Sequence, residues 1–103
     1  MVVEYIRYEI PAARHAEFLA AYEAAGQELN ASEHCSGFEV SQGVEEPDHF
    51  IVRILWDSVE GHERGFRTGP LFASFLAKVR ALFGDIREMK HYQVRQQGKG
   101  GRA

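Results

Sequence analysis

Four stretches of the chain alternate between apolar and polar residues, the pattern of β-strands that bury one face. They span residues 2–10, 38–44, 49–56 and 85–94. The third stretch is apolar almost throughout, which favours a central position in a sheet. The turn residues Glu45-Glu46-Pro47-Asp48 separate the second stretch from the third. These two strands are therefore predicted to form a hairpin.

Two further segments carry apolar residues at intervals of three or four, as amphipathic helices do. The first spans 12–32, behind a proline suited to a helical first turn. Its predicted buried stripe consists of Phe18, Leu19, Tyr22, Ala25 and Leu29. The second spans 71–83, and its predicted buried side consists of Leu71, Phe72, Phe75, Leu76, Val79, Leu82 and Phe83. A short helix from 57 to about 64 is predicted just before it.

The predicted order is β-α-β-β-α-β, which right-handed crossovers fold into a ferredoxin-like α+β sandwich. In this fold a four-stranded antiparallel sheet carries both helices on one face. Its other face would present an apolar patch to water, made of Val3, Tyr5, Ile51, Leu55 and Met89. Such a patch usually marks an interface. We therefore expect a homodimer in which two sheets pack face to face.

Composition excludes several classes of protein and of binding partner. The 103 residues include 15 acidic and 12 basic side chains, a net charge of −3, which argues against nucleic acid. No run approaches the ~18 apolar residues of a membrane span, and the first residues do not resemble a signal peptide. The one cysteine excludes an intrachain disulfide and favours a cytoplasmic compartment. One domain is expected over 1–94, followed by a disordered basic tail over 95–103.

Two runs, 54–62 and 65–75, resemble the core of the antibiotic biosynthesis monooxygenase family. They contain a tryptophan at the end of the third strand, a Ser-Val-Glu helix start and a later helix with spaced phenylalanines. The resemblance extends over about 2–94. It implies a dimeric α/β barrel with a pocket between sheet and helices in each subunit. The family includes cofactor-free oxygenases of quinols and polyketide aromatics, haem-degrading enzymes and members without demonstrated chemistry.

The haem-degrading branch of the family has an asparagine, a tryptophan and a histidine at three positions, which here are Ile6, Phe66 and Leu76. Leucine has no donor atom for iron, so haem degradation by that mechanism is not expected. The polyketide oxygenase branch has an asparagine, a tryptophan, a tyrosine and an arginine at positions that here are Val52, Trp56, His62 and Leu76. Only the tryptophan is retained, with His62 as a substitute for the tyrosine.

Trp56 and His62 are the predicted catalytic residues. Trp56 is either a wall for a planar substrate or a core aromatic residue. His62 is either a general base for a phenolic proton or an exposed helix histidine. The residues predicted to shape the pocket around the substrate are Tyr8, Phe66, Phe72 and Tyr92.

Two functions follow from these residues. The first is a cofactor-independent monooxygenase, in which O2 reacts directly with the anion of a quinol-like or polycyclic phenol. The second is a non-catalytic module of the same fold that binds a small molecule or serves for dimerisation. The sequence contains no nucleotide-binding, phosphate-binding or metal-binding motif, so no cofactor and no metal are expected. Flavin stays open as a ligand, because small barrels can bind it without a motif.

Overall fold

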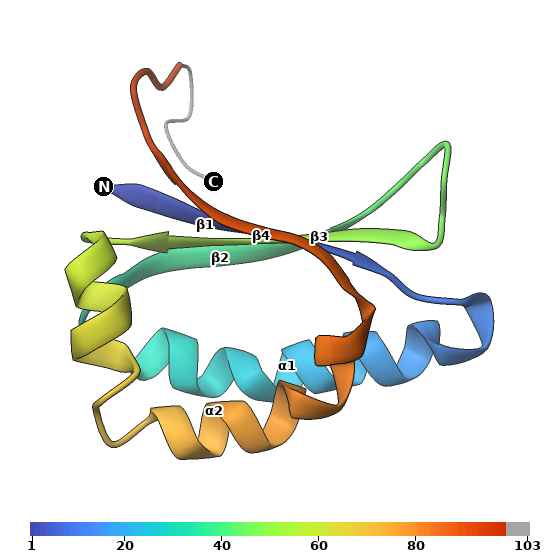
Figure 1. Ribbon diagram of the computed structural model, residues 1–103, viewed down its shortest axis with the longest axis horizontal. Coiled ribbons are helices and arrows are strands. Elements are labelled where there is room, and N and C mark those ends of the chain that lie inside the picture. The colour runs from blue at the N-terminus through green and yellow to red at the C-terminus, as the bar shows by residue number, and fades with distance from the viewer. Residues whose placement is uncertain (99–103) are drawn as a thin grey trace.

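The computed structural model describes residues 1–98 and contains one antiparallel sheet of four strands (Figure 1). The strands are β1 (Val2–Glu9), β2 (Cys35–Gln42), β3 (His49–Trp56) and β4 (Ile86–Gln93). Their order in the sheet is β2-β3-β1-β4, so β3 has a neighbour on each side, as its apolar sequence predicted. Element order and sheet order together confirm the ferredoxin-like α+β fold.

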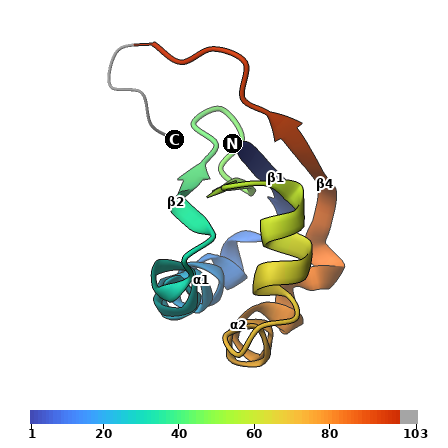
Figure 2. The same cartoon turned by 90° about the vertical axis from the view of Figure 1, so that its left-hand side faces the viewer.

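Both helices, α1 (His15–Ala31) and α2 (Phe72–Val79), lie on the same face of the sheet (Figure 2). Each is shorter than its sequence pattern predicted, because a 3₁₀ turn replaces part of it. Ala12–Arg14 forms such a turn before α1, and Arg80–Asp85 forms one after α2. The second turn leads directly into β4, so it sets where that strand begins.

The core lies between the helices and the sheet. Large side chains from β1, β3 and α1 fill it, including Tyr8, Phe18, Tyr22, Phe50 and Trp56, each at most 2% exposed. Leu19, which was predicted to be buried, is 46% exposed. In an α-helix, successive residues are about 100° apart, so Leu19 points to solvent when its neighbour Phe18 points inward.

The segment between β3 and α2 forms a π-helical turn, Gly61–Phe66, rather than the predicted short α-helix over 57–64. His34 Nδ1 lies 2.8 Å from Asp57 Oδ2 beneath this turn. Gly61 and Gly65 pass so close to these two side chains that a Cβ atom at either glycine would collide with them. This close approach of Gly61 and Gly65 to the two side chains directs His62 inward, where it is 4% exposed. π-helical turns often occur at functional sites.

A β-bulge changes which residues of β4 face the helices. Tyr8 of β1 is opposite Ile86, whereas Arg7 is opposite Glu88, so one extra residue enters β4 at this point. Beyond the bulge, the residues facing the helices are Met89 and His91. The prediction that placed Met89 on the open face was therefore wrong.

The predicted apolar residues of the open face are less exposed than expected. Val3 and Leu55 are only 8% and 5% exposed within a single chain. Tyr92 lies on this face, 46% exposed, with its ring edge against Tyr5 at a centroid distance of 5.9 Å. Arg53, on the same face, pairs with Glu39 of the neighbouring strand at 2.8 Å.

Arg95–Gly98 have no regular secondary structure. The other residues of the predicted disordered tail, 99–103, lie outside the described residues. Within residues 1–98, no helix combines the length and the apolar character needed to cross a membrane.

Candidate active site

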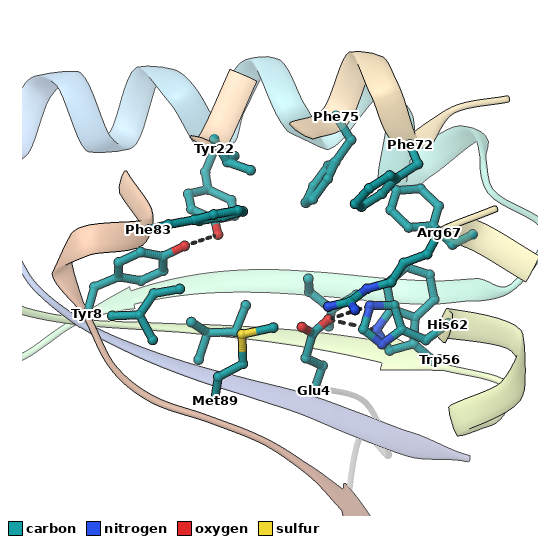
Figure 3. Close-up of a pocket in the computed structure, with 15 residues that line it drawn as sticks. Glu4, Tyr8, Tyr22, Trp56, His62, Arg67, Phe72, Phe75, Phe83 and Met89 are labelled. Carbon is teal, nitrogen blue, oxygen red and sulfur yellow. Dashed lines mark hydrogen bonds and ion pairs between the residues drawn. The ribbon is translucent and has the colours of Figure 1, made fainter. Parts of the chain in front are cut away.

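A cavity of about 370 Å³ lies between the sheet and α2. Figure 3 shows the 15 residues that line it. Most are aromatic or aliphatic, and they come from β1, β3, β4, both helices, the π-helical turn with the residue after it, and the 3₁₀ turn after α2. They are Glu4, Ile6, Tyr8, Tyr22, Ile54, Trp56, His62, Phe66, Arg67, Phe72, Phe75, Val79, Phe83, Ile86 and Met89. A mostly apolar cavity with a few converging polar groups is typical of small-molecule sites.

One end of the cavity is polar and is built around Glu4, which is 4% exposed. The Trp56 indole donates a hydrogen bond from Nε1 to Glu4 Oε1 over 3.1 Å. His62 Nε2 lies 3.4 Å from the same oxygen. The rings of Trp56 and His62 are stacked, with centroids 4.5 Å apart and planes 12° apart. Strand alternation places Glu4 here, since it shares the helix-facing side of β1 with Ile6 and Tyr8.

The second nitrogen of His62 is also occupied. Its Nδ1 lies 2.8 Å from Nε2 of His91, and one of these two nitrogens donates while the other accepts. His91 comes from β4 and is half-buried. Arg67, which lines the cavity, follows the π-helical turn and brings a positive charge near both Glu4 and His62.

Burial dominates the electrostatics of this end. It raises the pKa of Glu4, while the Trp56 hydrogen bond and the charge of Arg67 act in the opposite direction. Burial, helped by electrostatic repulsion from Arg67 and His91, lowers the pKa of His62 to about 4. The neutral imidazole is thus the form present near pH 7. A neutral imidazole can accept a proton on one nitrogen while it donates one from the other.

The opposite end of the cavity has a second, smaller polar group. The hydroxyls of Tyr8 and Tyr22 are hydrogen-bonded to each other at 2.6 Å (Figure 3). Burial raises the pKa of Tyr8 to about 12 and also raises that of Tyr22. Both hydroxyls therefore keep their protons at neutral pH. The stretch between the two polar ends is apolar and aromatic, which suits a flat ring system.

Five of the six predicted site residues come together in this cavity. They are Tyr8, Trp56, His62, Phe66 and Phe72. Tyr92 does not, because the bulge in β4 puts its side chain on the open face of the sheet. Its predicted place in the pocket was therefore wrong.

The sequence interpretation missed Glu4, Tyr22, Arg67 and His91 as members of the site. Glu4 could have been found, because it alternates in register with Ile6 and Tyr8. Tyr22 was predicted only as a core residue. His91 could not have been found, since the bulge that turns it inward leaves no trace in the alternation. Ile6 lines the cavity at the position where the haem-degrading branch has an asparagine.

The fold and the cavity define a ferredoxin-like α+β protein with an aromatic cavity between its sheet and its helices. The profile of the antibiotic biosynthesis monooxygenase family matches residues 1–78, and the chain belongs to this family. A comparison with curated proteins finds no match.

Solved structures share the fold at low sequence identity. SnoaB from Streptomyces nogalater, a cofactor-independent oxygenase solved in a mutant form, is 16% identical with a TM-score of 0.77, over 93% of this chain and 94% of that one. A candidate antibiotic biosynthesis monooxygenase from Bordetella bronchiseptica is 20% identical with a TM-score of 0.74, over 92% and 97%. A conserved protein from Methanosarcina mazei is 16% identical with a TM-score of 0.73, over 91% and 92%.

Proposed function

We propose that the protein is a cofactor-independent monooxygenase that oxidises a quinol-like or polycyclic phenol with O2. The observation that carries the proposal is the pairing of a flat aromatic cavity with a buried acid–base group at one end. Family membership and the likeness to SnoaB support the same class of reaction. A mere core would not need a carboxylate and an imidazole next to an open cavity, since burying them costs free energy.

The proposed reaction begins with loss of the phenolic proton to the acid–base group that includes His62. The phenolate is electron-rich enough to give one electron to O2, and the resulting pair combines at a ring carbon as a peroxide. Proton transfer and cleavage of the O–O bond release water and leave a carbonyl group at this carbon. One oxygen atom thus enters the product, and the other leaves as water together with two substrate hydrogens.

The residues of the cavity have separate roles in this proposal. His62 takes part in the proton transfer, and Trp56 holds it by ring stacking. Phe66 and Phe72 enclose the ring system of the substrate. Tyr8 donates a hydrogen bond to an oxygen at the far end of the substrate, so a molecule with polar groups at both ends fits best. Tyr92 is left out of the proposed site.

Oxygen uptake with a panel of naphthohydroquinones and naphthols tests this proposal. We expect uptake above the uncatalysed rate, and one ¹⁸O atom in the product when ¹⁸O2 is supplied. If no compound is consumed faster than without protein, the monooxygenase proposal is wrong. Mass spectrometry of a ligand that co-purifies would then favour the second function, a binding module of the same fold.

The homodimer is also part of the proposal, as is a cytoplasmic location. The partly exposed apolar residues on the open face, Tyr5, Ile51 and Tyr92, favour contact between two sheets. Size-exclusion chromatography with light scattering is expected to give twice the chain mass of 11.7 kDa. A monomer at micromolar concentration would contradict the dimer.

A further inference from the structure

We infer that Glu4, His62 and His91 form a proton relay, in which Glu4 is the first acceptor of the phenolic proton and His91 exchanges it with solvent. This inference rests on the proposed function, and it assigns roles to two residues that were not among the predicted site residues. The relay joins β1, the π-helical turn and β4.

The contacts of His62 favour an inner place in the relay. Its Nδ1 is hydrogen-bonded to His91 Nε2 at 2.8 Å, and its Nε2 faces Glu4 Oε1 at 3.4 Å. Each imidazole nitrogen thus faces a protein group that can give or take a proton. In the relay, a proton from a ligand in the cavity reaches His62 through Glu4.

Glu4 has the free atom that this step needs. Its Oε1 accepts the Trp56 hydrogen bond and faces His62, whereas its Oε2 has no hydrogen bond from any group within residues 1–98. Glu4 lines the cavity. A phenol bound in the cavity can therefore donate its proton to a carboxylate oxygen that no protein donor already holds.

His91 forms the outer end. It is absent from the cavity lining, it is half-buried, and its Nε2 contacts the inner histidine. The carboxylate is thus linked to the protein surface by two imidazoles in series. Two rings in this arrangement pass a proton without any movement of heavy atoms, since each ring can accept on one nitrogen and donate from the other.

The proton balance of the relay is complete. The phenol O–H bond breaks, and its proton forms an O–H bond on Glu4. The carboxyl group then turns so that its proton faces His62, and this proton moves to His62 Nε2 while the Nδ1 proton of His62 moves to His91 Nε2. His91 then releases its own Nδ1 proton to water, and the reverse sequence returns a proton for the peroxide.

The surroundings of the relay favour capture of a proton by Glu4 and its onward transfer to His91. Arg67 is near Glu4 and His62, and Glu63 is near Glu4. Burial raises the pKa of the carboxyl group, which favours its taking a proton from the bound phenol, and lowers that of His62, which favours release of a proton from His62 to His91.

The test compares three variants by oxygen uptake with the best naphthohydroquinone of the panel. Glu4→Gln keeps the size of the side chain and an oxygen for the Trp56 hydrogen bond, and is expected to lower kcat about 100-fold. His91→Asn keeps a polar group but cannot pass a proton, and is expected to lower kcat about tenfold with little change in KM. His49→Asn is the matched control, since His49 lies at the opposite end of β3 from Trp56.

Chemical rescue separates a relay from a structural role. Imidazole added to the buffer is expected to restore most of the kcat of His91→Asn and none of the kcat of Glu4→Gln. Equal kcat values for wild type and His91→Asn, or a loss that imidazole leaves unchanged, would overturn the relay. If Glu4→Gln does not fold by circular dichroism, the half-buried His91 still provides the test. A wild-type protein without turnover would overturn the proposed function itself, and the relay with it.

Discussion

Replacement of His62 by glutamine is expected to lower kcat about 100-fold or more while KM changes little. Glutamine can fill the space of the imidazole and keep a polar contact, either with Glu4 or with His91. It cannot accept a proton on one atom and release one from another. The aromatic walls that bind the substrate, Phe66 and Phe72, stay in place. Steady-state oxygen uptake measures both constants.

His49→Gln is the matched control for this variant, because it makes the same chemical change far from the cavity. His49 Nε2 lies 3.5 Å from Glu46 at the beginning of β3. We expect its kcat to match that of the wild type. A His62→Gln protein that keeps more than about a third of wild-type kcat, with an unchanged melting temperature, would remove His62 from the mechanism.

Because the pKa of His62 is low, the stability of the His62→Gln variant is expected to depend on pH differently from that of the wild type. In the unfolded chain a histidine binds its proton near pH 6.5, whereas folded His62 does so only near pH 4. Between these values the unfolded state binds more protons, so this residue makes the protein less stable as the pH falls from about 6.5 to about 4. Glu4, with its raised pKa, has the opposite effect and makes the protein more stable as the pH falls. The difference in melting temperature between wild type and His62→Gln isolates the contribution of His62.

The strand order could be predicted because alternation and turn residues act locally. Each of the four strands shows its period of two, and the crossover rule leaves few arrangements for β-α-β-β-α-β. The faces of β4 could not be predicted, because one extra residue near Arg87 reverses the side on which later side chains lie. This single insertion explains why Tyr92 was placed in the cavity, why Met89 was placed on the open face and why His91 was missed.

The polar end of the cavity depends on contacts between distant segments. Glu4 and Trp56 are 52 positions apart, and His62 and His91 are 29 positions apart. The sequence indicated the importance of Trp56 and His62, since both lie in the runs that resemble the family. It could not indicate that the π-helical turn buries His62 between a carboxylate and a second histidine. That arrangement follows from the packing of two glycines against His34 and Asp57, which only the folded chain shows.

Replacement of Phe18 by alanine is expected to cost about 3–5 kcal/mol of the free energy of unfolding, a large share of the total for a domain of this size. Phe18 is fully buried, and its ring is 4.9 Å from Tyr8, 5.2 Å from Tyr22 and 4.6 Å from Phe50 between centroids. Alanine would leave a void among rigid rings that cannot close it. Urea unfolding followed by tryptophan fluorescence or circular dichroism measures the loss.

The neighbouring residue provides the control, because Leu19→Ala removes an apolar side chain from the same turn of α1. Leu19 is 46% exposed, so we expect its loss to cost less than about 1 kcal/mol. The void in Phe18→Ala also lies behind the Tyr8–Tyr22 hydroxyl pair, so ligands that use this end of the cavity should bind more weakly than in Leu19→Ala. If the two variants lose the same free energy of unfolding, Phe18 is not on the side of α1 that faces the sheet. The position of Tyr22 in the cavity would then be wrong as well.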